Sequence, residues 1–142
     1  MWGKKIVLPW VSGTPLYEDG YVDRLSKHRI RVEFLHYADD ALSQFNQVQY
    51  PLIIINTTLS YRNVRLEWHQ LADVPIKLVR EIRENTINRK TPLILTSYSK
   101  KEKDPLLERV ISLQKELGDI EYFHLPDTNI DSLVKEIVLR IK

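Results

Sequence analysis

The feature that most constrains the fold is a run of four aliphatic residues, 52–55, three of which are consecutive isoleucines. Pro51 precedes the run, and short polar residues beginning with Asn56 follow it. A short apolar run without alternation predicts a strand buried on both faces, as in the middle of a parallel sheet. Ligand and reaction sites of open α/β sheets lie at the carboxyl ends of such strands. Asn56 therefore marks the predicted functional edge.

Apolar runs and helical patterns alternate along the rest of the chain. Four further strands are predicted at residues 5–11, 30–35, 91–96 and 122–125. Pro9 is expected to truncate or bend the first of them. Helices are predicted to begin near residues 18–19, at Asp39 or Asp40, at Asp73 and at Asp104, with a last one over 130–141. Asp39 or Asp40 and Asp73 are expected to cap their helices, and Gly118 is expected to end the fourth helix.

Five strands alternating with five helices predict one α/β domain over residues 1–142, with a doubly wound, five-stranded parallel sheet in a three-layer arrangement. The 142 residues suit a single domain with its own core. The apolar runs are strand-sized, so no membrane span is predicted. We expect a soluble protein and a cytoplasmic location, because the chain has no cysteine and no signal-peptide core near Met1.

The charge is nearly balanced, with 21 basic and 19 acidic residues and a formal net charge of +2. Such a balance disfavours nucleic-acid binding through bulk electrostatics. The absence of cysteine excludes disulfides, thiolate metal sites and cysteine nucleophiles. The four histidines lack metal-ligand spacing. They are His28, His36, His69 and His124. We therefore expect neither a metal nor another cofactor.

Four segments together resemble the receiver domains of bacterial two-component response regulators. They are residues 40–42, similar to an acidic-Ala-Leu signature; 78–85 and 91–99, similar to the third helix and fourth strand; and 118–126, similar to Gly-Ala-x-x-Tyr-x-x-Lys-Pro. Counted onward from Ala41, the phospho-acceptor position of the family falls on Asn56. The resemblance covers nearly the whole chain. It implies a flavodoxin-like sheet with the strand order 2-1-3-4-5.

The resemblance also implies a phosphorylation site, which this sequence lacks at most positions. Receivers use an acidic pair after the first strand, an acceptor aspartate, a hydroxyl residue and a lysine. The matching positions here are about Trp10 (Pro9 to Val11), Asn56, Thr96 or Ser97, and Leu125. The neutral amide of an asparagine is not a carboxylate nucleophile. The resemblance therefore indicates a degenerate, non-enzymatic pseudo-receiver.

Three other features near the predicted site have competing interpretations. Glu18 and Asp19 are the nearest substitutes for the missing acids, but we expect them to stabilise a helix start rather than to bind metal. Residues 12–14 are expected to form a plain turn rather than a phosphate cradle. Residues 59–70 exceed the corresponding receiver loop and can serve either as a lid or as a contact surface.

The leading hypothesis is a signalling module that recognises another protein, or a second copy of itself, without phosphorylation. The resemblance places its interaction surface at Tyr98, Leu106, Tyr122, His124, Ile130 and Val134. The alternative is a flavodoxin-like domain that binds a nucleotide or flavin near Ser12, Thr14, Asn56, Thr57 and Thr96. A third hypothesis, nucleic-acid contact, is disfavoured by the charge balance. It would use Arg62, Arg65, Lys77, Arg80 and Arg83.

Overall fold

A computed structural model describes residues 5–13, 18–98 and 107–141. Its five strands form one parallel sheet in the order β2-β1-β3-β4-β5, which confirms the predicted order. The strands are β1 (Ile6–Val11), β2 (Ile30–Leu35), β3 (Ile53–Asn56), β4 (Leu93–Ser97) and β5 (Ile120–His124).

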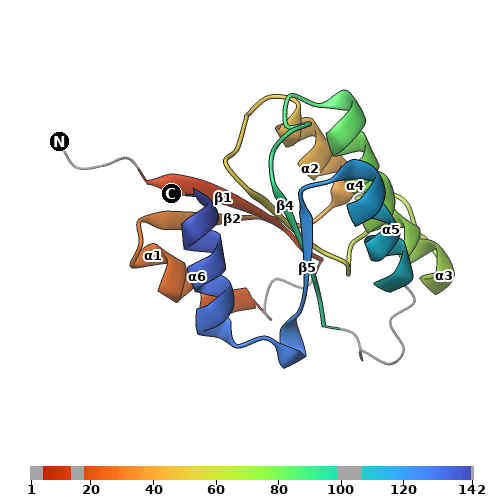
Figure 1. Ribbon diagram of the computed structural model, residues 1–142. Coiled ribbons are helices and arrows are strands. Elements are labelled where there is room, and N and C mark those ends of the chain that lie inside the picture. The colour runs from red at the N-terminus through yellow and green to blue at the C-terminus, as the bar shows by residue number, and fades with distance from the viewer. Residues whose placement is uncertain (1–4, 14–17, 99–106, 142) are drawn as a thin grey trace.

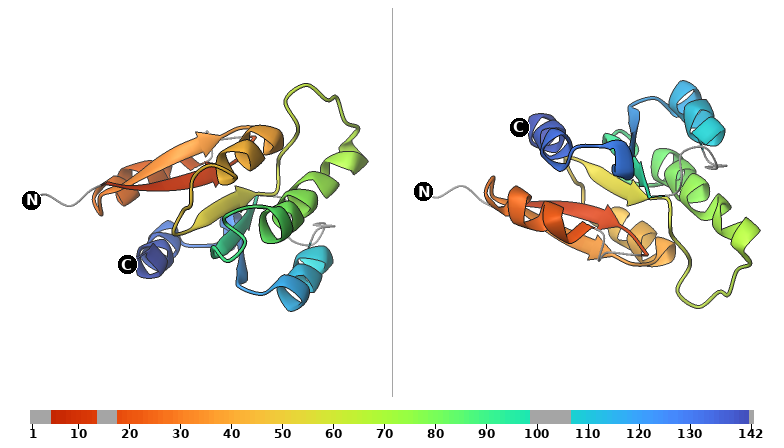
Figure 2. Two further views of the ribbon diagram at one scale, coloured as in Figure 1. Left: turned by 90° about the horizontal axis from the view of Figure 1, so that it is seen from above. Right: turned by 90° about the horizontal axis from the view of Figure 1, so that it is seen from below.

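Helices cover both faces of this sheet, which confirms the three-layer arrangement (Figures 1 and 2). One face carries α1 (Asp19–Ser26) and α6 (Ile130–Ile141), and the other carries α2 (Ala38–Phe45), α4 (Asp73–Asn85) and α5 (Leu107–Leu117). A four-residue helix, α3 (Trp68–Leu71), precedes α4, and a short 3₁₀ turn, η3 (Leu125–Asp127), follows β5.

Alternation along β3 divides the interior into two apolar clusters. Ile53 and Ile55 belong to the cluster beneath α2, α4 and α5, whereas Ile54 belongs to the cluster beneath α1 and α6. All three side chains are fully buried, as the unbroken apolar run predicts. Burial of each isoleucine side chain stabilises the folded state by roughly 1.5–3 kcal/mol relative to leaving it exposed. The next side chain, Asn56, consequently faces the α1–α6 side.

The expectation that Pro9 truncates the first strand is wrong, because β1 runs from Ile6 through Val11 and pairs with β2 throughout. The backbone N–H groups of Ile6 and Ser12 donate to carbonyls of the β2 side, and that of Gly13 donates toward the β3 side. Backbone N–H groups point alternately to the two neighbouring strands, so the backbone nitrogen of Pro9 also points toward β3. Pairing with β3 begins only at Trp10, so the missing N–H of Pro9 removes no ladder bond.

The predicted helix caps are wrong at two helices. Tyr37 precedes α2, and Asp39 and Asp40 lie in its first turn. Asp73 is the first residue of α4, and its carboxylate pairs with Arg109 at 2.6 Å instead of capping the helix. Carboxylates in a first turn still interact favourably with the helix dipole.

The prediction for Gly118 is confirmed, because α5 ends at Leu117 and Gly118 has a φ of 67°. This is the left-handed conformation that glycine adopts without steric cost. The predicted start of that helix at Asp104 lies outside the described residues.

The long segment between β3 and α3, residues 57–67, runs along the α2–α4 side (Figure 2). Arg62 anchors it, since its guanidinium pairs with Asp40 and lies 4.8 Å from the ring centre of Tyr37. Leu59 is buried in the cluster on this face. The contacts of Leu59 and Arg62 thus hold this part of the segment on the face opposite the side chain of Asn56. The side chain of Trp68, which we expected to contribute to a lid or contact surface, is outside the described set.

Candidate functional site

A row of polar side chains crosses the three central strands at their carboxyl ends. Asn56, the last residue of β3, pairs with Thr96 of β4. On the other side Val11 pairs with Ile55, so Ser12 is the next residue of β1 and comes opposite Asn56. Ser12, Asn56 and Thr96 are each 0% exposed. The sheet therefore brings the predicted acceptor and hydroxyl positions together in a dry environment.

Glu18 adds a carboxyl group to this row. It lies immediately before α1 and is also 0% exposed. Its Oε1 accepts hydrogen bonds from Ser12 Oγ at 3.1 Å and from Asn56 Nδ2 at 3.0 Å. Its side chain makes no capping bond to α1, so the prediction of a simple cap is wrong for Glu18. We refer to Glu18, Ser12 and Asn56 as the Glu18 cluster.

Asn56 is held in one orientation by partners at both ends of its amide. Nδ2 donates to Glu18, and Oδ1 accepts a hydrogen bond from the backbone N–H of Thr58 at 2.8 Å. The backbone N–H of Thr57 donates to the carbonyl of Thr96, which ties the end of β3 to β4. The side chain of Asn56 therefore links the end of β3 to Glu18, which in turn binds Ser12 at the end of β1.

The electrostatics of the Glu18 cluster differ from those of an ionised acid pair. Burial raises the pKa of the Glu18 carboxyl to about 7, although the hydrogen bonds from Ser12 and Asn56 act in the opposite direction. The negative charge of Asp19 raises this pKa slightly further. Oε2 of Glu18 has no hydrogen-bond partner among the described residues. The Glu18 cluster thus contains one carboxyl group whose charge changes near neutral pH.

Trp10 and Leu125, the other two predicted site residues, are part of the apolar core on the same face. Trp10 pairs with Ile54, two positions before Asn56. Its ring is 0% exposed and packs 5.2 Å from that of Tyr21. Leu125 begins η3 and is 6% exposed in the same cluster. Because β1 is not truncated, Ser12 rather than Trp10 faces Asn56.

No group of three or more histidine, aspartate or glutamate side chains that could hold a metal ion occurs within residues 5–13, 18–98 and 107–141. The polar row also lacks a cationic side chain, since Leu125 fills the position after β5. Within the described parts of the chain, the geometry brings Asn56 and Thr96 together without a metal-ligating set or a phosphate-binding cation.

Sequence reasoning did not identify Glu18 as a member of this site. The available signal was its position at the amino end of the first helix. In a parallel sheet, helices that return across a face begin at the carboxyl edge of the strands. A polar residue one position before α1 is therefore delivered to the strand ends.

A hollow of about 380 Å³ lies near the strand ends, beside the β3–α3 segment. Its lining residues are Gly13, Thr57, Thr58, Leu59, Ser60, Leu71 and Ala72. The backbone N–H of Gly13 donates to the carbonyl of Thr58 at 2.9 Å. A Cβ atom at Gly13 would lie 3.0 Å from that oxygen, so this close approach favours glycine. Ser12, Asn56 and Thr96 do not line the hollow, and Thr14 is outside the described residues.

The predicted interaction residues differ in their accessibility. Tyr98 and Ile130 are half-buried against the α1–α6 cluster, and Tyr122 is half-buried against the opposite cluster. His124 ends β5 and is also half-buried. Val134 is 5% exposed and belongs to the core, so its assignment to the surface was wrong. Leu106 lies outside the described residues.

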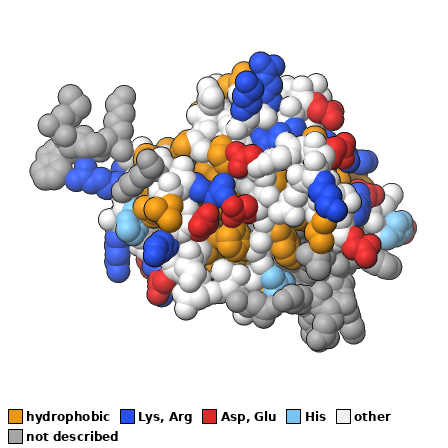
Figure 3. Space-filling view, in the orientation of Figure 1, with side chains coloured by type: hydrophobic (Ala, Val, Ile, Leu, Met, Phe, Trp, Pro, Cys, Tyr) orange, Lys and Arg blue, Asp and Glu red, His pale blue; other side chains and the backbone are white. Residues whose placement is uncertain are grey.

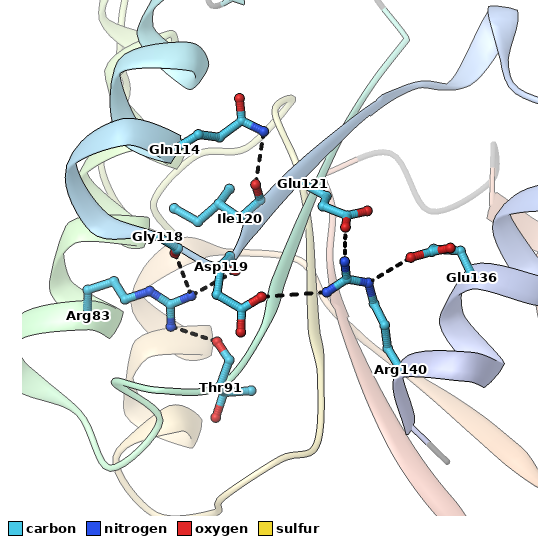
Figure 4. Close-up of polar contacts among 9 residues, drawn as sticks. All are labelled: Arg83, Thr91, Gln114, Gly118, Asp119, Ile120, Glu121, Glu136 and Arg140. Atoms are coloured by element: carbon cyan, nitrogen blue, oxygen red, sulfur yellow. Dashed lines mark hydrogen bonds and ion pairs between the residues drawn. The ribbon is translucent and has the colours of Figure 1, made fainter.

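The face that contains β5 carries a compact group of charges between α5 and α6. Arg140 pairs with Glu121, with Asp119 at 3.6 Å and with Glu136 at 3.1 Å (Figure 4). In the space-filling view, acidic and basic side chains alternate with apolar ones across this face (Figure 3). β5 is an edge strand of the sheet. Arginine beside half-buried aromatic side chains is a composition found at protein interfaces.

The arginines considered for nucleic-acid contact are mostly engaged within the domain. Arg62 pairs with Asp40, and Arg80 pairs with Glu116. Arg83 donates to backbone carbonyls, including that of Thr91 at 2.6 Å (Figure 4). These contacts reduce the positive charge that this side of the domain offers to a phosphate backbone.

Comparison with solved structures identifies the fold. The chain is similar to the receiver domain of the Francisella response regulator 1452, with a TM-score of 0.69, 19% identity and 96% coverage of each chain. It is also similar to HP1043, an orphan response regulator of H. pylori, with a TM-score of 0.69, 13% identity, and 99% and 100% coverage. The protein thus has the receiver fold, as the sequence resemblance implies.

A third similar structure comes from a family of streptococcal redox sensors that evolved from two-component response regulators, with a TM-score of 0.64 and 21% identity. The match covers 98% of the present chain and 51% of that one. No protein-family model and no curated protein matches the sequence. Among the helices described here, none has the length and hydrophobicity needed to traverse a bilayer.

Proposed function

We propose that this chain is a receiver-like regulatory module that recognises another protein, or a second copy of itself, without phosphorylation of residue 56. The observation that carries the proposal is the hydrogen bond between Asn56 and Glu18. This hydrogen bond engages the side-chain amide of residue 56, the position where the receiver resemblance implies an acceptor carboxylate. An amide does not provide that nucleophile. A cytoplasmic location is part of the same proposal.

The surroundings of Asn56 support this interpretation. Leu125, at the position that matches the family's lysine, is buried among apolar side chains and offers no cation to phosphoryl oxygens. Ser12 stands opposite Asn56 on β1, where the resemblance implies acidic residues nearby. Mg²⁺ requires several oxygen ligands, preferably including carboxylates. The Glu18 cluster supplies a single carboxyl, half protonated near pH 7.

Two of the similar structures support a regulatory role by analogy. One is described as an orphan response regulator and another as a redox sensor that evolved from response regulators. Analogy of fold does not define function by itself, because one fold hosts many sites. Here the analogy agrees with an amide, rather than a carboxylate, at residue 56.

The contact surface in this proposal is the face formed by α5, β5 and α6. It retains Tyr98, Tyr122, His124 and Ile130 from the predicted set, and Leu106 stays a prediction. Arg140 and its acidic partners lie on the same face. Charged side chains on an edge strand oppose indiscriminate pairing with strands of other chains. This arrangement supports recognition of a partner with complementary charges.

The proposal is tested by incubation with acetyl phosphate and Mg²⁺, followed by intact-mass spectrometry. The wild-type protein should gain no phosphoryl group, whereas an aspartate-bearing receiver domain treated in parallel should gain one. Asn56→Asp serves as the matched variant that restores the carboxylate. A phosphoryl group on the wild-type chain, mapped to any residue at the strand ends, would contradict the proposal.

The interaction surface is tested separately by sedimentation over a range of concentrations. If the chain self-associates, Tyr122→Arg should weaken the association, because it places a bulky cation beside Arg140. Lys77→Glu, on α4, is the control and should leave association unchanged. Self-association that is insensitive to Tyr122→Arg would place the contact elsewhere.

A second candidate function is the binding of a small ligand in the hollow beside Gly13. The favouring observation is its volume of about 380 Å³ and its three hydroxyl-bearing residues, Thr57, Thr58 and Ser60. The volume falls in the range of small-molecule pockets. A thermal-shift screen with flavins, nucleotides and cyclic dinucleotides tests it. A large, saturable stabilisation by one compound would favour this function.

A further inference from the structure

A second hollow lies between α1 and α6, away from the Glu18 cluster. Its volume is about 400 Å³. Its lining residues are Arg24, Lys27, His28, Asp131, Val134, Lys135, Val138 and Leu139. The two helices lie next to each other on one face of the sheet (Figure 1). We refer to this hollow as the α1–α6 groove.

The lining comes from two segments of the chain. Arg24 lies in the last turn of α1, Lys27 is the C-cap residue of that helix, and His28 follows in the turn before β2. Lys135 and Leu139 are four residues apart on α6. Side chains three or four positions apart share one helix face. The groove therefore has cationic groups on both sides.

Apolar side chains form the base and one wall of the groove. Val134 is buried and Val138 is half-buried against the α1–α6 cluster. Leu139 is 64% exposed, the highest value among the large apolar side chains that are described as exposed. A single exposed leucine is ordinary. Here, however, Leu139 borders the same hollow as Val134 and Val138, and the three side chains form its apolar strip.

The charges of the groove are not balanced internally. The guanidinium of Arg24 donates to Asp131 at 2.9 Å and to the carbonyl of Gly20 at 3.1 Å, which neutralises Asp131. Lys27 and Lys135 form no ion pair with any residue in the described parts of the chain. The groove thus combines an apolar strip with two lysines available to an anionic partner.

We propose that the α1–α6 groove binds a short acidic amphipathic helix of a partner protein. Its apolar side chains contact Val138 and Leu139, and its carboxylates pair with Lys27 and Lys135. An apolar stripe of a helix in a hydrophobic groove is a recurrent mode of peptide recognition. Asp131 and the apolar base disfavour a phosphate backbone as the occupant. This surface is distinct from the α5–β5–α6 face of the proposed function.

The dimensions of the groove suit a helix of a few turns. From Asp131 to Leu139 the lining follows α6 for eight steps along the helix, which corresponds to about 12 Å. A partner helix of roughly three turns spans this distance and places apolar residues at i, i+3, i+4 and i+7. Rim lysines contribute mainly to association rate and selectivity.

The experiment uses a fluorescent synthetic peptide of about 16 residues, with leucines on one helical face and glutamates on the other. A second peptide replaces every glutamate with lysine. Fluorescence anisotropy measures binding to the full chain. The acidic peptide should bind in a salt-dependent manner and the basic peptide should not. Amide chemical shifts should change at residues 24–28 and 134–139.

Variants locate the binding surface. Lys27→Glu combined with Lys135→Glu should weaken binding of the acidic peptide at least about tenfold, and Leu139→Ser should weaken it severalfold. Lys77→Glu, on the opposite face, should bind like the wild type. Circular dichroism and thermal midpoints verify that each variant is folded. Leu139→Ser removes an exposed group and should fold normally even if the double charge reversal does not.

Three results would overturn the proposal. The first is unchanged anisotropy of the acidic peptide up to its solubility limit. The second is equal binding by the wild type, the Lys27→Glu/Lys135→Glu variant and Leu139→Ser. The third is preferential binding of anionic phospholipid vesicles or duplex DNA, tested in parallel, with no binding of the acidic peptide.

Discussion

The side-chain amide of Asn56 donates a hydrogen bond to Oε1 of Glu18 at 3.0 Å, although the two residues are 38 positions apart in the sequence. A carboxylate at residue 56 would face the carboxyl group of Glu18, and the pKa of one of the two groups would rise. A neutral amide instead supplies a donor. The contact therefore stabilises the strand ends without a bound ion and holds the β1, β3 and α1 termini together.

The first prediction concerns the pH dependence of stability. The pKa of Glu18 is about 7 in the fold and near 4.5 in the unfolded chain, so the folded state binds more protons between these values. The free energy of unfolding therefore falls as pH rises from about 4.5 to 7, by roughly 1–3 kcal/mol, and this contribution is constant above pH 7. Glu18→Gln keeps an acceptor for Ser12 and Asn56 and removes the ionisation.

Urea unfolding at several pH values measures the effect. Glu18→Gln should be more stable than the wild type at pH 8 and should approach it near pH 4.5. Asp19→Asn is the control, because its side chain is exposed and should change stability by less than about 0.5 kcal/mol. An equal offset between Glu18→Gln and wild type at every pH would contradict a titrating Glu18.

A second prediction concerns Asn56→Asp. The substitution removes the Nδ2 donor and places two carboxyl groups in contact, which raises the pKa of one of them. We expect a loss of about 2–3 kcal/mol at pH 8 that diminishes toward pH 5. In the double variant Glu18→Gln/Asn56→Asp, the like-charge contact is gone and most of the loss should be recovered. Additive effects of the two substitutions would argue against direct coupling.

A third prediction concerns Asn88, a buried side chain that uses all its hydrogen-bonding groups. Nδ2 donates to the carbonyls of Phe45 and Val48, and Oδ1 accepts from the backbone of Tyr50 and the hydroxyl of Thr91. Asn88→Ala leaves these buried groups unpaired and should cost about 2–4 kcal/mol.

The control for this prediction is Asn85→Ala, three residues away. Asn85 is exposed and donates only to Glu81 among the described residues. Its replacement should change the free energy of unfolding by less than about 0.5 kcal/mol. Thermal or urea denaturation compares the two variants. Similar losses at both positions would show that the network around Asn88 is not energetically important.

A fourth prediction concerns Arg83, whose guanidinium joins three segments. It donates to the carbonyls of Thr91 at 2.6 Å and Asp119 at 3.1 Å (Figure 4). It also donates to the carbonyl of Arg89 at 3.1 Å. Lysine cannot reproduce this planar fork. We expect Arg83→Lys to lose about 1–2 kcal/mol, measured by urea unfolding. Arg65→Lys, at an exposed position, should be neutral, and an equally neutral Arg83→Lys would contradict the structural role.

The fold was predictable because its strongest signals are local. The isoleucine run specifies a doubly buried central strand, and Gly118 marks a helix end by its backbone conformation. These features depend on residues adjacent in the chain. The effect of Pro9 was not predictable in this way. It depends on where the pairing of β1 with β3 begins, which is a property of the assembled sheet.

The site was only partly predictable for the same reason. Asn56 and Thr96 follow from their positions at strand ends, and the structure pairs them. Glu18 was underestimated because its partners, Ser12 and Asn56, are brought to it by the folded sheet. The predictions of helix caps were wrong for the same reason, because Asp40 and Asp73 pair with arginines that are distant in the sequence.

The burial of Leu125 has a consequence for the side chains that this position tolerates. Its side chain packs in the same cluster as Trp10 and Tyr21, so a lysine there would bring an ammonium group into a hydrocarbon interior. Such a group costs several kcal/mol unless it finds a partner. A cation at residue 125 would therefore require compensating changes among the apolar side chains that surround it.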